Sequence, residues 1–208
     1  MDLAEAEARH AFARTQAGET AAYGTVVRLY QDRIFSAVYR MVHHVDDAAE
    51  ITQEAFMRGL EKIDSFRGDA GPYTWLFRIA MNAAVSRIRK GSRRRTTSLD
   101  TPSVTWQTSL PGLSVADEGP SPEELASLTE DQRAVAVALS KMDAEYRAIL
   151  VMRDMEGFDY KQMADVLGMP MGTVKSRLFR ARVAMRELLQ DHFAARYRNS
   201  TKEGGPDK

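Results

Sequence analysis

Residues 160–189 read YKQMADVLGMPMGTVKSRLFRARVAMRELL, which has the layout of two helices joined by a tight turn. Ala164 is small enough for the two helices to approach closely, and Gly168 supplies the backbone freedom that the turn needs. Val174 and Leu178 lie about one turn apart and would hold the second helix against the first. The spacing predicts a helix-turn-helix, whose second helix commonly lies in the major groove of DNA.

The second of these helices carries different chemistry on its two sides. At about 100° per residue, its apolar residues form one narrow stripe: Val174, Leu178, Ala181, Met185 and Leu188. Outside that stripe, hydroxyl, cationic and aromatic side chains form what we term the duplex surface: Thr173, Lys175, Ser176, Arg177, Phe179 and Arg180. Arginine can bind guanine with two bonds, hydroxyls can bind phosphates, and a ring can contact a thymine methyl group. A solvated basic face would look similar, but the helix-turn-helix spacing favours DNA.

The N-terminal part of the chain is also predicted to be helical. Helix formers dominate from about Ala4 to Lys90, and no strand-type alternation occurs. Loop signals divide this part into helices near 5–16, 20–43, 47–63 and 72–90. We expect Asp47 to cap the third helix, with Glu50 completing a capping box.

The predicted helix 72–90 has an unusual outer side. Opposite its broad apolar arc lies a stripe of mixed chemistry: Trp75, Arg78, Asn82, Val85, Ser86 and Arg89. A ring can stack on an unpaired base, an amide can bond the base edge, and guanidiniums can bind the backbone. The preceding loop, 65–71, could form one wall of a pocket for an extruded base. The other interpretation is a half-buried core tryptophan among solvated arginines, and these residues alone leave both open.

The predicted helix 47–63 gathers acidic and amide side chains on one side, which we term the acidic face: Asp47, Glu50, Gln53 and Glu54. Such a face repels DNA and fits a basic protein surface. A solvated helix face is the alternative.

A change of composition marks a linker between about 91 and 122. Four prolines lie among Ser, Thr and Gly without apolar periodicity. Residues 72–97 contain cations and no acid, whereas residues 99–132 contain acids and no cation. The balance of 29 Lys+Arg against 29 Asp+Glu therefore hides a basic domain end beside an acidic tether.

The composition also excludes several classes of protein. The absence of cysteine rules out disulfide frameworks, thiolate catalysis and cysteine-based zinc sites. The first residues do not resemble a signal peptide, and no apolar run is long enough to span a membrane. We expect a cytoplasmic protein without membrane insertion.

After the linker, helices are predicted near 123–140, 143–155, 159–167 and 172–190. The sequence thus predicts an all-α fold with two small helical domains, 1–90 and 123–192, joined by a flexible acidic linker, 91–122. Residues 193–208 are predicted to be a disordered tail.

Four motifs in order resemble the extracytoplasmic-function (ECF) sigma factors of the sigma-70 family. They are DDAAEITQEAF at 46–56, DSFRG at 64–68, YTWLFRIAMN at 73–82 and PMGTVKSRLFRAR at 170–182. The resemblance extends from about residue 15 to 190. It implies a sigma factor that directs core RNA polymerase to promoters and starts DNA melting, with no catalytic residue, cofactor or metal of its own.

The resemblance also implies roles for the surfaces described above. Residues 1–90 would form region 2, whose acidic face docks on the clamp helices of the largest polymerase subunit. The −10 element would be opened, and a flipped base captured, by a strand surface: Ser65, Phe66, Arg67, Gly68, Trp75, Arg78, Asn82 and Arg89. Residues 123–192 would form region 4, which contacts the polymerase flap and reads the −35 duplex with the duplex surface. Many members of this family are held by an anti-sigma factor, and we expect one here.

Two other classes of function fit these residues less well. A two-domain helix-turn-helix regulator would need a sensing domain before residue 123, and the block 64–82 argues against it. A helical metalloenzyme would draw its ligands from His43, His44, Asp46, Asp47, Glu50 and Glu54. None of these residues forms the Glu-x-x-His pair that carboxylate-bridged metal sites in helical bundles use.

Overall fold

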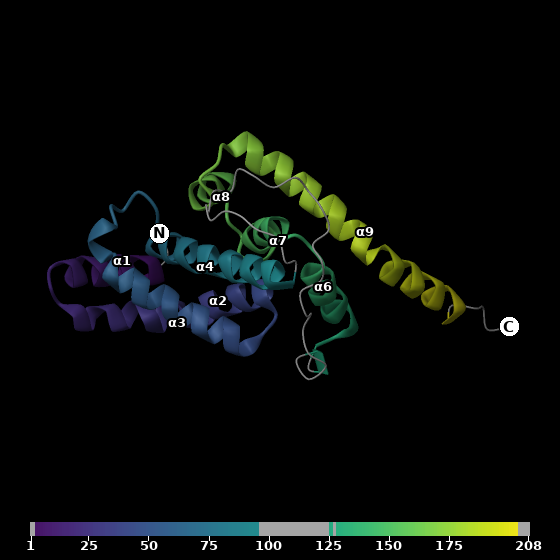
Figure 1. Ribbon diagram of the computed structural model, residues 1–208, viewed down its shortest axis with the longest axis horizontal. Helices are drawn as coiled ribbons and strands as arrows, with labels where there is room; N and C mark the ends of the chain where they lie inside the picture. The colour runs from purple at the N-terminus through teal and green to yellow at the C-terminus, as the bar shows by residue number, and fades with distance from the viewer. Residues whose placement is uncertain (1–2, 96–124, 127, 204–208) are drawn as a thin grey trace.

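The computed structural model describes residues 3–95, 125, 126 and 128–203. Its regular elements within these residues are all helical, and they form an N-terminal part, α1–α4, and a C-terminal part, α6–α9 (Figure 1). The predicted all-α fold with two helical parts is confirmed.

The N-terminal part is a four-helix bundle closed around an apolar core. Its helices are α1 (Leu3–Gln16), α2 (Tyr23–Val42), α3 (Val45–Glu61) and α4 (Pro72–Arg95), with single 3₁₀ turns at Thr20–Ala22 and Ile63–Ser65. In α2 the buried residues recur every three or four positions, from Val26 through Tyr30 and Ile34 to Met41. Helices α3 and α4 approach closely at Gly59, where an added Cβ would lie 2.6 Å from Leu76.

The junction between α2 and α3 differs from the expected one. His43 ends α2 in the left-handed conformation, with φ 53°, and its N–H donates to the Tyr39 carbonyl. The next residue, His44, is the N-cap of α3, and its side chain accepts from the Asp47 N–H. The predicted cap at Asp47 is therefore wrong, because the helix starts earlier. Asp47 instead lies in the first turn, where a carboxylate is favoured by the helix dipole.

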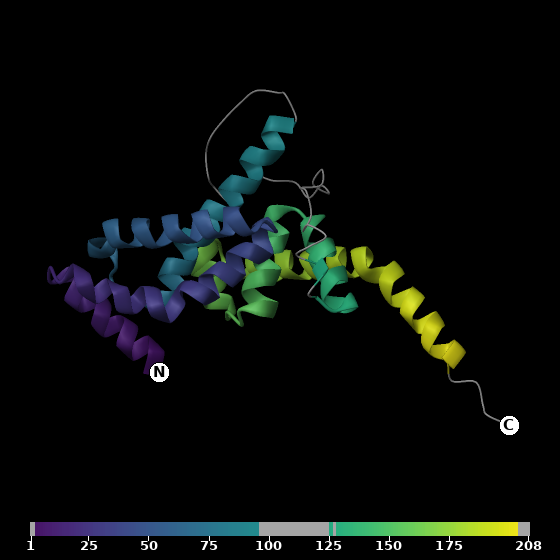
Figure 2. The ribbon, with the colours of Figure 1, turned by 90° about the horizontal axis from the view of Figure 1, so that it is seen from below.

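The C-terminal part contains α6 (Glu130–Ser140), α7 (Ala144–Leu150), α8 (Tyr160–Leu167) and α9 (Met171–Glu203). A single π-helical turn, Val151–Met155, extends α7. Helix α9 runs well past its predicted end and projects away from the rest of the molecule (Figures 1 and 2). Residues 193–203 of the expected disordered tail are helical, and 204–208 lie outside the described residues.

The two parts pack directly against each other, with α7 and α8 on α4 and α6 beside α2. Most of the expected linker, 96–122, lies outside the described residues, and its first five residues continue α4 to Arg95. No pattern in the sequence predicts this packing, which places residues of the two parts in shared contacts.

Candidate nucleic-acid and polymerase interfaces

The helix-turn-helix forms as its spacing predicts. Asp159 caps α8 in a capping box with Gln162, and Gly168 ends that helix in the left-handed conformation, with φ 62°. Val174 and Leu178 of α9 are buried in the core that α8 also lines. The helix that carries the duplex surface is thereby anchored through its apolar stripe.

Most of the duplex surface faces solvent. Lys175, Ser176 and Arg180 are exposed, and Phe179 is 71% exposed, an unusual position for a ring of this size. The Ser176 hydroxyl donates to the Thr173 carbonyl at 3.0 Å. These side chains are available to a DNA groove.

Thr173 and Arg177 of the duplex surface are less exposed, and Arg177 is also paired within the protein. It is half-buried, and its Nη1 donates to a Glu145 carboxylate oxygen of α7 at 2.8 Å. An arginine in this ion pair does not reach outward from α9.

The loop of the strand surface is held by α1. The Gln16 amide nitrogen donates to the Ile63 carbonyl at 2.9 Å and to the Phe66 carbonyl at 3.1 Å. The Phe66 ring meets Phe12 edge-on at 4.6 Å and Trp75 at 5.7 Å between centroids. Trp75 is half-buried against the core, so one side of its ring is occupied by Phe12 and Phe66.

Along α4, the strand surface passes from exposed to covered. Arg78 is exposed, whereas Asn82 is half-buried, and its side-chain oxygen has no hydrogen-bond partner among the described residues. Val85 of the same stripe is only 1% exposed, and Arg89 donates to Glu145 of α7. The C-terminal part therefore covers the end of this stripe.

The acidic face lies beside a groove and is partly paired within the bundle. Arg87 of α4 binds Asp47 at 3.0 Å and also binds Glu50. The hydrogen bond to Glu50, and then the charges of both acids, raise the pKa of Arg87. Glu54 pairs with Arg58, and Gln53 is exposed. A groove of about 380 Å³ lies on the surface where α2 packs on α3, and its lining includes Val27, Gln31, Asp32, Phe35, Thr52, Gln53, Phe56 and Met57.

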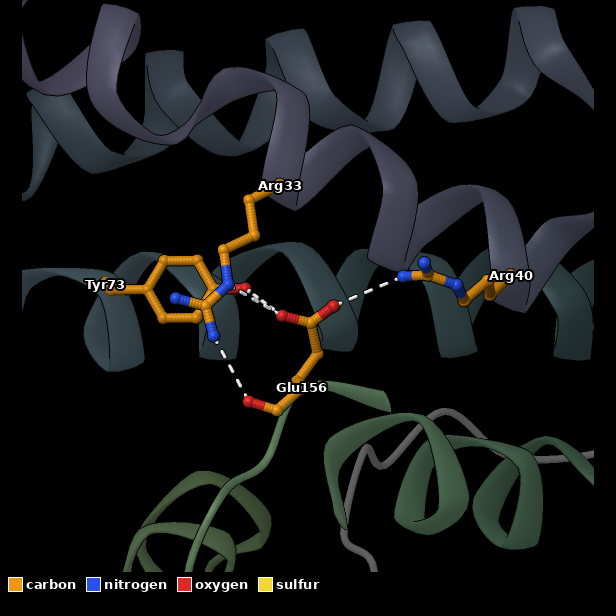
Figure 3. A network of polar contacts seen from close by, with 4 residues as sticks. All are labelled: Arg33, Arg40, Tyr73 and Glu156. Atoms are coloured by element: carbon orange, nitrogen blue, oxygen red, sulfur yellow. Dashed lines mark hydrogen bonds and ion pairs between the residues drawn. The ribbon is translucent and has the colours of Figure 1, made fainter. Parts of the chain in front are cut away.

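Two glutamates that the sequence analysis did not single out bridge the two parts. Glu156 has a side chain 5% exposed and receives bonds from Arg33 Nε at 2.9 Å, Arg40 Nη1 at 3.2 Å and the Tyr73 hydroxyl at 2.7 Å (Figure 3). Burial, and then the bond to Glu156, raise the pKa of Tyr73. Glu145 is 6% exposed and binds both Arg89 and Arg177. Burial raises the pKa of Glu145, against the attraction of those two arginines.

No sequence signal could have identified this pair. Glu145 lies in the first turn of α7 and Glu156 in the turn after Met155, both ordinary places for a glutamate, and the cations they bind in the N-terminal part are 56 to 123 positions away in the chain.

The described part of the chain contains neither a membrane-spanning helix nor a cluster of metal-ligating side chains. None of its helices has the length and apolarity required to cross a bilayer. In the same residues no three histidine, aspartate or glutamate side chains are arranged to hold a metal ion.

Comparisons with known proteins identify the family of both helical parts. The family model described as Sigma-70 region 2 matches residues 26–94, and that described as Sigma-70, region 4 matches residues 132–185. The RNA polymerase sigma-H factor of Pseudomonas aeruginosa is 34% identical over 179 residues, which cover 85% of this chain and 91% of that protein. The ECF RNA polymerase sigma factor SigW of Bacillus subtilis is 32% identical over 174 residues, covering 84% and 92%.

A solved structure shares the fold and the arrangement of helices. The sigma factor RpoE of Bartonella quintana, in complex with the anti-sigma factor NepR, is 25% identical. It superposes with a TM-score of 0.59 over 81% of this chain and 96% of that chain. The chain therefore belongs to the extracytoplasmic-function sigma factors of the sigma-70 family, which are non-enzymatic subunits of RNA polymerase.

Proposed function

We propose that this sigma factor reads promoters through two separate surfaces, the duplex surface at the −35 element and the strand surface at the −10 element. The observation that supports this most is the row of exposed Lys175, Ser176, Phe179 and Arg180 on a helix anchored by a helix-turn-helix core. A row of cations, a hydroxyl and a ring can contact both phosphates and base edges in the major groove.

At the −10 element, the strand surface would capture an unpaired base. The Trp75 and Phe66 rings are already in contact and offer a stacking platform beside the loop. The buried Asn82 oxygen without a partner is suited to accept from a base edge, because a buried acceptor gains most from a bond that it lacks. Extruding a base costs a few kcal/mol, which stacking at about 1–3 kcal/mol per base would offset.

Core polymerase would bind region 2 at the acidic face and the adjoining groove. The clamp helices of the largest subunit are the expected partner there, and the polymerase flap is the expected partner of region 4. Exposed Gln53 and Met57 border the groove with Phe56, so polar and apolar contacts are both available. The linker, 91–122, would join the two domains through the polymerase cleft.

An anti-sigma factor is a further expected partner. The related Bartonella quintana sigma factor was solved in complex with one. Because a sigma factor acts on chromosomal DNA, we expect the protein to act in the cytoplasm.

The duplex surface is tested by Arg180→Ala, with Arg186→Ala, also exposed on α9, as the matched control. Both proteins are combined with core polymerase on a promoter library with randomised −35 and −10 elements, and the transcripts are sequenced. Loss of a base contact worth about 1–3 kcal/mol predicts roughly a 5- to 150-fold loss at the preferred −35 sequence. Unchanged −35 preference, or weaker binding to core polymerase, would count against the assignment.

The strand surface is tested by Asn82→Ala in the same library. Base preference should change at one −10 position, while the −35 preference measured in the same reaction stays as in the parent. A −10 preference identical to that of the parent would remove Asn82 from the proposed site.

A further inference from the structure

One short turn of region 4, Glu156-Gly157-Phe158, lies in the contact between regions 2 and 4. Gly157 has φ +73°, a conformation that other residues rarely adopt, and it turns the chain so that both neighbours face region 2. The Arg153 guanidinium fixes the far side of the turn by donating to the Phe158 carbonyl at 2.7 Å. The turn is thus a defined structural unit.

Region 2 meets this turn with a matching set of groups. Arg33, Arg40 and the Tyr73 hydroxyl converge on the Glu156 carboxylate from two helices (Figure 3). Arg33 also donates to the Glu156 carbonyl at 3.1 Å and lies 3.9 Å above the centre of the Tyr73 ring. The Phe158 ring stacks on Tyr73 at 5.9 Å and meets Phe77 edge-on at 4.7 Å.

We propose that these groups of region 2 form a receptor for an acid-Gly-aromatic turn, occupied in the free protein by its own Glu156–Phe158, and that occupancy holds the sigma factor closed and unable to read a promoter. A buried carboxylate is tolerated only where donors replace its water. Glu156 has three such donors, all from region 2, so these bonds form only while the domains are together, and water replaces them when the domains separate.

The closed state also withholds DNA-reading residues from both domains, an argument that rests on the proposed function. The single Glu145 carboxylate binds Arg89 of the strand surface and Arg177 of the duplex surface. The buried position of Val85 shows that the α4 stripe between Asn82 and Arg89 is covered. Both arginines thus direct a donor to Glu145 of α7 in the closed state and not to DNA.

The size of a promoter requires the domains to separate. Elements at −10 and −35 lie roughly 25 base pairs apart, or about 85 Å at about 3.4 Å per base pair. In the closed state one carboxylate touches both surfaces, so they lie within a few side-chain lengths of each other. Polymerase binding would therefore select an open state in which the receptor is vacated.

The test measures opening and DNA access in the same full-length protein. Because the sequence contains no cysteine, exposed Glu61 and Gln190 can be replaced by cysteines and labelled with a fluorescence donor and acceptor. Glu156→Gln keeps the shape and removes the charge, and Asp165→Asn, exposed on α8, is the matched control. Binding is measured, without polymerase, to a random-sequence pool of duplexes about 20 base pairs long at low salt.

Glu156→Gln should lower the energy transfer between the labels and tighten duplex binding by about three- to tenfold, because a larger fraction of the chain is open. Arg40→Gln removes a donor from the receptor side and should act in the same direction. Both should keep the helix content of the parent by circular dichroism. If both variants fold and neither differs from Asp165→Asn in energy transfer, the proposed receptor is wrong.

A failure of the proposed function gives a different result. Arg180→Ala, added to Glu156→Gln, should weaken duplex binding without altering energy transfer. If it leaves binding unchanged, the duplex surface is misassigned, while the energy transfer still decides whether the turn holds the domains together.

Discussion

His43 is a buried imidazole at the end of α2, 4% exposed and next to the guanidinium of Arg147. Burial, and then the charge of Arg147, lower the pKa of His43 from 6.5 to about 3. The folded chain therefore binds fewer protons here than the unfolded chain at pH values between these two. Stability from this site is complete above about pH 6.5 and is lost as the pH falls.

His43→Asn tests this contribution. Asparagine tolerates the left-handed backbone conformation and does not titrate. Between pH 7 and pH 5 the free energy of unfolding should fall by about 2 kcal/mol more in the parent than in His43→Asn. Urea unfolding at the two pH values measures both differences. Equal pH dependence in the two proteins would mean that the imidazole is accessible to protons in the folded state.

At the scale of single residues, the sequence predicted which side chains are exposed better than it predicted which side chains form ion pairs. Lys175, Phe179 and Arg180 point outward as the helical wheel requires, because α9 packs on its neighbours through one stripe. Arg177 follows the same periodicity but is held by Glu145. A helical wheel cannot show which side of a helix another domain will cover.

At the scale of helices, the periodicity of apolar residues predicted which segments are helical better than it predicted where each helix ends. The segments 5–16, 72–90 and 159–167 all contain helices, since their buried residues recur every three or four positions. The predicted ends of α4 and α9 are too early, because glycine and polar composition, which usually stop a helix, do not stop these two. Gly91 has open space around it and lies within the helical run, where glycine costs stability without breaking the helix.

Substitution by alanine should have opposite effects on stability at two glycines, Gly59 of α3 and Gly91 of α4. At Gly59 in α3, a Cβ would lie 2.5 Å from the Tyr23 hydroxyl and 2.6 Å from Leu76, both buried. Gly59→Ala should lower the free energy of unfolding by about 1–3 kcal/mol through overpacking. Gly91→Ala, with nothing within 4 Å, should raise it by up to about 1 kcal/mol. Thermal unfolding of both variants measures the contrast, and a stabilising Gly59→Ala would mean that α3 and α4 have room between them for a methyl group.

At the scale of the whole molecule, the closed arrangement depends on side chains from both domains. Arg147 of α7 is 1% exposed and donates to the Ser140 carbonyl at 2.8 Å, to the Met142 carbonyl at 3.1 Å, and to the Met41 carbonyl at the end of α2. A buried hydrogen bond from a charged donor contributes more to folding stability than one from a neutral donor. The division into two helical parts was predictable from composition, but this contact was not, because it joins residues 106 positions apart.

Arg147→Met should therefore affect both domains at once. It keeps much of the apolar stem and removes the donors to carbonyls of regions 2 and 4, which predicts a loss of about 2–4 kcal/mol in the free energy of unfolding. In a Trp106→Phe background, Trp75 is the remaining tryptophan and reports on region 2 alone. Its fluorescence transition in urea should move to lower concentration together with the loss of helix measured by circular dichroism.

Lys141→Met is the matched control, since Lys141 is exposed and lies between Ser140 and Met142, whose carbonyls Arg147 binds. It should leave both transitions in place within about 0.5 kcal/mol. If Arg147→Met shifts the helix signal but not the Trp75 signal, region 2 draws no stability from region 4 and the two domains unfold independently. If both signals shift together, the domains stabilise each other in the free protein, and the free energy lost when they separate must be offset by binding to the polymerase.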